Sequence, residues 1–271
     1  MQARSQQVLL VAGASVLAIV LYLSPQKVVR EDKAAETEIP AFESELNSAK
    51  SGLKRQEADL ISALESELSK EAGNVSLMDS LGRRWDALQK PAIAAHYFEQ
   101  HALLDQDEKS WLNAAYRYFD AFKSTTDSLQ RNEMVGNAIR CYEAVLKVNP
   151  KNLDAKTDLG ICYTEGTANP MQGIMMLRDV VKENPEHENA QFNLGVLSMR
   201  SGQYEKAAER FQKVLSINPE RKEMYLMTGK AYMMAGNMTK AAENFEKLKK
   251  ETADATLVAE ANNYINQISN H

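Results

Sequence analysis

Residues Gln191–Pro219 read QFNLGVLSMRSGQYEKAAERFQKVLSINP. Two helical patterns flank a break at Ser201–Gly202, and the final proline ends the second pattern because proline cannot continue a helix. Gly195 and Ala207 have little or no side chain, so we expect the two helices to approach closely at these positions. Phe211 is expected to fill the space behind this contact. The stretch therefore predicts a helix–turn–helix hairpin.

The same pattern recurs along the chain with a period near 34 residues. Four kinds of position repeat: a glycine, a small residue, a large apolar residue and a proline. They are Gly160, Gly195 and Gly229; Ala138, Gly173, Ala207 and Ala241; Tyr142, Leu177, Phe211 and Phe245; and Pro150, Pro185 and Pro219, in steps of 34 or 35. Because four kinds of position stay in phase over several copies, the chain is built from repeats.

Leucine-glycine, alanine, an aromatic and proline at these offsets resemble the tetratricopeptide repeat (TPR) family. The resemblance implies an all-α fold, a right-handed superhelical solenoid of about five repeats and a C-terminal capping helix. It also implies protein or peptide binding in a concave groove lined by the first helix of each repeat. The expected repeats span residues 75–107, 108–151, 153–186, 188–221 and 222–252, and the capping helix spans residues 253–269.

Composition limits the function classes. Charged residues make up 25% of the 271-residue chain and the net charge is −5, which argues against a nucleic-acid-binding surface. The two cysteines, Cys141 and Cys162, fall on consecutive predicted helices that should pack together. A disulfide between them is conceivable, but two buried free cysteines are the preferred interpretation.

The segment Val8–Leu23 contains sixteen residues without a charge. As a helix it would cover about 24 Å, somewhat less than the roughly 30 Å of a bilayer core, and polar neighbours could extend it. A cleaved signal peptide is the alternative, but no small-x-small cleavage site follows the segment. We therefore expect residues 1–24 to form a short tail and an uncleaved single-pass transmembrane anchor.

The orientation of this anchor is open. Arg4 precedes the apolar segment, and Lys27, Arg30 and Lys33 follow it, which by the positive-inside rule favours a cytoplasmic C-terminal domain. A charged tail, an apolar segment and a long domain in this order are instead typical of an export signal. We favour an extracytoplasmic repeat domain, periplasmic if the organism is bacterial, with the cytoplasmic orientation as the alternative.

Between the anchor and the repeats, residues 25–40 carry both signs of charge and two prolines, and we interpret them as a linker. Residues 41–73 have the pattern of an amphipathic helix or a helix pair, and residues 74–271 form the predicted repeat domain. Within the second repeat, the polar insertion 123–133 is expected to be a surface loop.

No enzyme chemistry is apparent. The four histidines form no H-E-x-x-H pattern, and the sequence has no G-x-S-x-G elbow, phosphate-binding glycine loop or paired-cysteine zinc motif. His96 and His101, five residues apart on one predicted helix, are better explained by packing and surface exposure than as metal ligands. We expect no catalytic residue, cofactor, metal or small-molecule substrate.

The TPR resemblance places particular side chains in the groove. Its offsets make the groove polar and acidic at one end and rich in aromatic residues and methionine toward the C-terminus. The expected groove residues are Arg83, Leu112, Asn113, Tyr116, Phe119, Ile161, Phe192, Asn193, Val196, Met199, Leu226, Met227, Lys230 and Met233, with Asp79, Asp86, Thr157, Asp158, Glu165, Arg200 and Met234 beside them. Methionine is flexible and polarizable, so such a groove can adapt to varied apolar partners.

Two functions fit these features. The first is a membrane-anchored scaffold or adaptor that binds proteins in its groove and assembles or organises a membrane-associated complex. The second is an accessory factor of translocation or quality control that holds exported polypeptides. A clamp for the C-terminal carboxylate of chaperones is not expected, because the positions that hold Lys or Arg in that subgroup hold Asp79, Leu112, Thr157 and Phe192 here.

Overall fold

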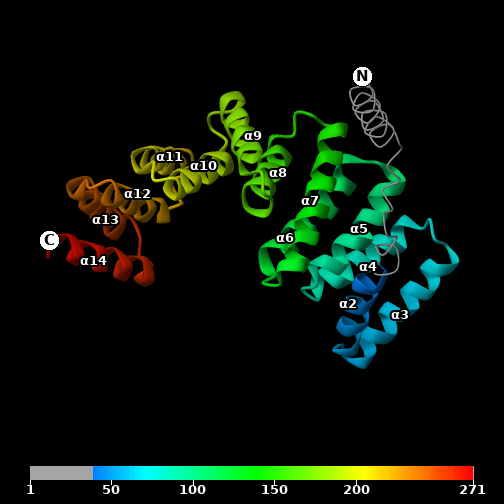
Figure 1. Ribbon diagram of the computed structural model, residues 1–271. Coiled ribbons are helices and arrows are strands. Elements are labelled where there is room, and N and C mark those ends of the chain that lie inside the picture. The colour runs from blue at the N-terminus through cyan, green and yellow to red at the C-terminus, as the bar shows by residue number, and fades with distance from the viewer. Residues whose placement is uncertain (1–38, 271) are drawn as a thin grey trace, which may run out of the picture. The chain divides into compact units, whose positions relative to one another are not determined.

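The computed structural model describes residues 39–270, and the predicted anchor and most of the predicted linker lie outside them. The chain divides into two units, residues 1–48 and residues 49–271, and the second unit contains all of the helical hairpins. The described residues form thirteen helices and no strand, which confirms the all-α prediction for this part of the chain (Figure 1). Among these helices, none is both long and apolar enough to cross a membrane.

The helices pair as consecutive hairpins. After α2 (Ile39–Ser51) and α3 (Arg55–Lys70), which are separated by a break at Gly52, ten helices form five hairpins and α14 closes the chain. The five hairpins are α4 (Val75–Ala87) with α5 (Pro91–Asp105), α6 (Glu108–Ser124) with α7 (Ser128–Val148), α8 (Leu153–Gly166) with α9 (Pro170–Glu183), α10 (Glu188–Arg200) with α11 (Tyr204–Ile217), and α12 (Glu223–Met234) with α13 (Met238–Glu251); α14 is Ala255–Ser269.

Each helix from α3 onward packs mainly on the helices next to it in the chain. In addition, α8 contacts α10, so the first helices of the third and fourth hairpins touch, and α12 contacts the closing helix α14. We call α4, α6, α8, α10 and α12 the leading helices, and α5, α7, α9, α11 and α13 the trailing helices. Packing restricted to neighbouring units is the property that defines a solenoid.

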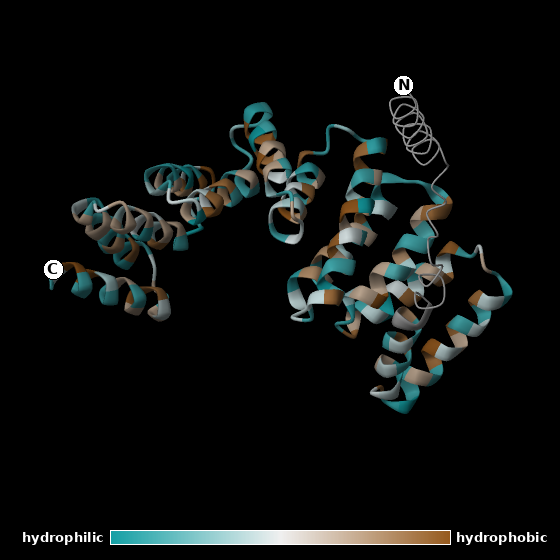
Figure 2. Ribbon diagram, in the orientation of Figure 1, coloured by the Kyte–Doolittle hydropathy of each residue, from teal (hydrophilic) through white to brown (hydrophobic). Residues whose placement is uncertain are grey.

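Hydrophobic and hydrophilic residues alternate along the helices, as amphipathic helices require (Figure 2). The largest fully buried side chains come from several hairpins, and they include Trp85, Phe122, Tyr142, Phe211 and Phe245. The core is therefore distributed along the repeats, and Leu177, Val180, Ala190 and Leu194 form a cluster separate from the one that contains Phe211 and Phe245. Cys141 and Cys162 are both buried and form no disulfide, in agreement with the preferred interpretation of the sequence.

A glycine of each leading helix lies against an aromatic ring of its trailing helix in three hairpins. A Cβ added to Gly195 would lie 2.7 Å from Phe211, and one added to Gly229 would lie 2.5 Å from Phe245. Gly82 has the same relation to Phe98, at 2.7 Å. The sequence predicts that Gly195 and Ala207 mark the close approach and that Phe211 lies behind it. In the structure the Phe211 ring itself occupies the space beside Gly195.

The third hairpin departs from this arrangement. Leu177 replaces the aromatic ring, and the two backbones come close together, since a Cβ on Gly173 would lie 2.1 Å from the Gly160 carbonyl oxygen. A backbone-to-backbone approach of this kind is possible only where both helices lack a side chain.

The predicted surface loop at residues 123–133 is mostly helical. Helix α6 extends to Ser124, only Thr125–Asp127 lie between the helices, and α7 begins at Ser128. The Asp127 carboxylate accepts a hydrogen bond from the Gln130 amide at 2.8 Å, which caps the start of α7. The inserted residues therefore lengthen α7 to 21 residues, and the prediction of a loop was wrong for most of them.

The C-terminal helix α14 covers the last hairpin. The Tyr264 ring stacks on Phe245 with a centroid distance of 5.1 Å, and Lys230 donates a hydrogen bond to Glu260 at 2.7 Å. The Lys230 ammonium also lies 5.1 Å from the centre of the Tyr264 ring. Apolar residues of α14 thus shield the core while its polar residues face outward, as expected of a terminal cap.

The glycine–ring contact gives a first prediction. Replacing Gly195 with valine should lower the free energy of unfolding by about 1–3 kcal/mol, because the added carbons overlap the Phe211 ring in a packed core. Gly136 of α7 is the matched control: a Cβ there meets nothing within 4 Å. Gly136→Ala should raise stability by up to about 1 kcal/mol through helix propensity. Urea unfolding followed by circular dichroism measures both, and a neutral Gly195→Val would contradict the packing.

Candidate functional site

An aromatic cluster lies between the leading helices α6 and α8. Tyr142 reaches from α7 and is fully buried. The Tyr116 and Phe119 rings meet it edge-on, with centroid distances of 6.1 Å and 6.4 Å. The Tyr142 hydroxyl donates a hydrogen bond to Asp158 of α8 at 3.3 Å. The cluster thus connects the second and third hairpins and places a carboxylate beside partly exposed aromatic rings.

Asp158 is a half-buried carboxylate among other acidic groups. The pKa of Asp158 is raised from 3.8 to about 6, mainly by burial and in addition by the negative charges of Asp154 and Asp120, against the hydrogen bond from Tyr142, which lowers it. Burial and the charges of Asp158 and Asp154 also raise the pKa of Tyr116. Among residues 42–270, no cationic side chain forms an ion pair with Asp158. A positive charge brought to this place would therefore be stabilised.

The last two leading helices, α10 and α12, present apolar side chains. Phe192, Val196 and Met199 of α10 and Met227 and Met233 of α12 are only partly buried, and they pack against the core of the last two hairpins. The Arg221 guanidinium lies 4.7 Å from the centre of the Phe192 ring. These side chains offer apolar contact area that is already ordered by the packing beneath it.

Several other expected groove residues are buried or bonded within the chain, so they are less available to contact a partner. Ile161 and Leu226 are buried, with 8% and 5% exposure, and Lys230 is engaged by α14. Asn193 donates its side-chain amide to the Asn189 carbonyl at 2.8 Å. Arg83 and Asn113 are exposed, and Arg83 pairs with Asp79 at 2.9 Å. Leu112, like Tyr116 and Phe119 on the same helix, is partly buried.

Besides its ion pair with Arg83, Asp79 contacts the imidazole of His101, which the sequence did not predict. His101 of α5 places Nδ1 2.6 Å from Asp79 and Nε2 3.0 Å from Asp105, so both ring nitrogens face a carboxylate. His101 therefore connects α4 and α5, as a packing role implies.

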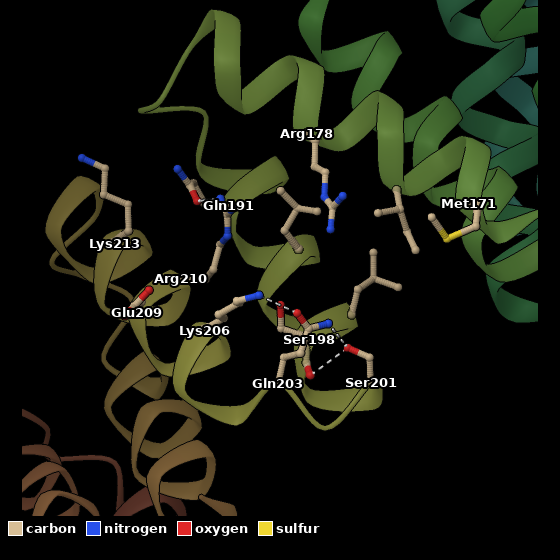
Figure 3. A pocket seen from close by; sticks show the side chains of 13 residues that line it. Met171, Arg178, Gln191, Ser198, Ser201, Gln203, Lys206, Glu209, Arg210 and Lys213 are labelled. Carbon is tan, nitrogen blue, oxygen red and sulfur yellow. Dashed lines mark hydrogen bonds between the residues drawn. The ribbon is translucent and has the colours of Figure 1, made fainter.

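A hollow of about 720 Å³ lies elsewhere, between α9, α10 and α11 (Figure 3). Its apolar lining includes Ile174 of α9 and Leu194 and Leu197 of α10. Four cations also line it: Arg178, Lys206, Arg210 and Lys213. None of these residues was among the expected groove positions. The sequence signal that could have indicated them is the spacing of Lys206, Arg210 and Lys213, which places three cations on one face of α11.

Comparisons with known proteins agree on the repeat type. Two sequence models described as tetratricopeptide repeat match residues 166–217 and 198–261. No curated protein matches the chain. Residues 166–261 therefore match tetratricopeptide repeats, and the described helical hairpins have a TPR-like fold.

Three solved structures have a similar fold. A TPR protein from Parabacteroides merdae ATCC 43184 is 18% identical over 84% of this chain and 85% of its own, with a TM-score of 0.55. MamA from Desulfovibrio magneticus RS-1 is 19% identical over 65% of this chain and 94% of its own, with a TM-score of 0.52. YrrB, titled a TPR protein with an unusual peptide-binding site, is 18% identical over 74% of this chain and 98% of its own, with a TM-score of 0.50. At these identities the likeness concerns the fold alone.

The raised pKa of Asp158 predicts a pH-dependent stability. In the unfolded chain this carboxyl titrates near 3.8 and in the fold near 6, so the folded state holds the proton more tightly between these values. The free energy of unfolding should then fall by about 1–3 kcal/mol as the pH rises through this window. Asp158→Asn keeps an acceptor for Tyr142 without the charge.

We expect Asp158→Asn to have a higher Tm than the wild type at pH 8 and an equal Tm at pH 4, measured by differential scanning fluorimetry. Asp179→Asn, on the exposed face of α9, controls for the loss of one carboxylate and should not give this pH-dependent difference. A lower Tm of Asp158→Asn at pH 8 would show that the Asp158 charge stabilises the fold.

Proposed function

We propose that this chain is a membrane-anchored scaffold that binds another protein along its leading helices and thereby assembles or organises a membrane-associated complex. The anchor assigned to residues 8–23 and the extracytoplasmic placement of the repeat domain are part of this proposal. Protease digestion of intact cells and of spheroplasts tests the placement, because an extracytoplasmic repeat domain is cleaved without lysis of the cytoplasmic membrane, whereas a cytoplasmic one is protected.

One observation carries the binding proposal. The Asp158 carboxylate is half-buried next to Asp154 and Asp120, and it has no cationic partner among residues 42–270. An unpaired carboxylate in such a place lowers stability, so its presence is best explained by a ligand that compensates the charge. The rings of Tyr116 and Phe119 lie beside it. This surface is suited to a lysine or arginine side chain flanked by apolar residues.

The apolar part of the leading helices extends the proposed contact. Phe192, Val196, Met199, Met227 and Met233 supply contact area for the partner's apolar side chains, and a few buried aromatic contacts commonly dominate such interfaces. A cation placed at Asp158 would then set the register of the bound segment. Leu112 and the exposed Asn113 and Arg83 supply further polar and apolar contacts toward the N-terminal hairpins.

The alternative, a factor that holds exported polypeptides, has one supporting observation. Met199, Met227 and Met233 are partly exposed on adjacent leading helices, and flexible methionines suit varied apolar sequences. The two functions differ in what is captured: a scaffold retains one defined membrane complex, whereas a holding factor binds many unrelated unfolded chains without fixed stoichiometry.

Photocrosslinking tests the binding surface directly. A photoreactive amino acid at Phe192 or Met227 of the full-length protein should capture a partner of defined mass from detergent-solubilised membranes. The control is the same amino acid at Leu129, which is 80% exposed on the trailing helix α7. Capture from Leu129 with none from Phe192 or Met227 would refute the leading-helix surface. A smear of many masses from the leading helices would favour the holding role.

Asp158→Asn should weaken binding of the captured partner about tenfold or more, the effect of losing roughly 1.4 kcal/mol, while it stabilises the free protein at neutral pH. Titration calorimetry with the purified partner measures the affinity. Unchanged affinity would show that Asp158 does not contribute to binding of the partner. The other residues of the leading-helix surface are tested by the crosslinking experiment.

A further inference from the structure

The hollow between α9, α10 and α11 is distinct from the leading-helix surface, because two of its three walls are trailing helices. Its base is well packed: Leu177 and Val180 of α9 form one cluster with Ala190 and Leu194 of α10. The packing of these residues therefore holds the walls of the hollow in place. Its volume of about 720 Å³ is within the range of sites that bind ligands of several hundred daltons.

The walls of the hollow are strongly cationic. Arg178 extends from α9 toward the hollow, and Arg210 approaches from α11 (Figure 3). Lys206 and Lys213 lie one turn to either side of Arg210 on the same face of α11. Lys213 forms an ion pair with Glu186, whereas Arg178, Lys206 and Arg210 form no ion pair with any carboxylate within residues 42–270.

The Arg210 guanidinium is held in place by an uncharged side chain, that of Gln191. It donates a hydrogen bond to the side-chain oxygen of Gln191 at 2.5 Å, and Gln191, only 5% exposed, donates in turn to the Pro185 carbonyl at 2.8 Å. Burial lowers the pKa of Arg210, and the positive charge of Arg178 lowers it further, against the opposing effect of Glu209. Two guanidinium groups thus face one hollow with a single carboxylate, Glu209, in its lining. An anionic ligand would relieve their repulsion.

We propose that this hollow binds an acidic segment of another protein, with an apolar side chain seated on Ile174, Leu194 and Leu197 and carboxylates facing Arg178, Lys206 and Arg210. On α11, Lys206 and Arg210 are about 6 Å apart along the helix, and Arg178 faces them from α9, so the unpaired cations are distributed over two walls of the hollow, which suits successive acidic residues of a peptide better than one compact anion. The cations line a recess between helices and not a flat face, which disfavours a membrane surface as the occupant.

The site would give the chain two binding surfaces of opposite charge. The leading helices present Asp158 to a basic segment, and the trailing helices present this hollow to an acidic one. The inference does not depend on the proposed function, because none of the hollow's residues was assigned to the leading-helix surface.

The test is a selection of random peptides displayed on phage against the immobilised full-length protein. The enriched sequences should combine glutamate or aspartate with leucine, isoleucine or phenylalanine. A synthetic, fluorescein-labelled copy of an enriched acidic sequence then gives the dissociation constant by anisotropy. The variant Arg178→Glu/Lys206→Glu should weaken this binding at least tenfold. Both side chains are exposed, so the variant is expected to fold, which circular dichroism checks.

The matched control is Lys240→Glu/Lys247→Glu, which changes the net charge equally at exposed positions of α13. Lys240 and Lys247 lie 34 residues after Lys206 and Lys213, in the next repeat, and binding should persist in this control. Equal loss in both variants would indicate nonspecific charge attraction, and unchanged binding in Arg178→Glu/Lys206→Glu would place the peptide elsewhere. Either result overturns the proposal, as would enrichment of basic sequences only.

Two further outcomes would assign the hollow to another occupant and also overturn the proposal. One is binding of vesicles containing phosphatidylglycerol that Arg178→Glu/Lys206→Glu abolishes, with no acidic peptide enriched. The other is concentration-dependent self-association, measured by analytical ultracentrifugation, that the same variant abolishes.

Discussion

The contact between a glycine of the leading helix and an aromatic ring of the trailing helix determines the packing of three hairpins of this chain. At Gly82, Gly195 and Gly229 the ring lies where a Cβ would be, so the two helices approach more closely than side chains on both would allow. This contact recurs in the first, fourth and fifth hairpins, and there it sets how far the leading helix stands from its trailing helix. The positions of Phe192 and Met227 follow from that arrangement, because they lie on the leading helices that contain Gly195 and Gly229.

The third hairpin shows what happens when the contact changes. Leu177 replaces the ring, and the backbones of Gly160 and Gly173 approach directly. The hollow lined by Arg178 and Arg210 lies between the trailing helix of this hairpin and the fourth hairpin. The departure from the repeat and the cationic hollow thus occur at the same junction.

The sequence predicted the fold better than the site. Periodicity at Gly160, Gly195 and Gly229 was sufficient for helical hairpins, because a repeat imposes the same packing in each copy. The extension of α7 into residues 128–133 was missed, since polar residues with a capping Asp127 can begin a helix as well as form a loop. Burial of Ile161 and Leu226, and the capture of Lys230 by α14, depend on contacts between hairpins that spacing alone does not specify. The cations of the hollow come from two trailing helices, so only their arrangement in space identifies them as one site.

A double-mutant cycle at Gly195 and Phe211 tests the glycine–ring contact most directly. Gly195→Val and Phe211→Leu should each lower the free energy of unfolding, the first by overlap and the second by loss of a buried ring. Combined, they should cost less than their sum by about 0.5–3 kcal/mol, because leucine overlaps the added carbons less than the ring does: a Cβ on Gly160 would lie 3.2 Å from Leu177, whereas one on Gly195 would lie 2.7 Å from Phe211. Strictly additive losses would show that Gly195 and Phe211 act independently, and the proposed basis of the hairpin would be wrong.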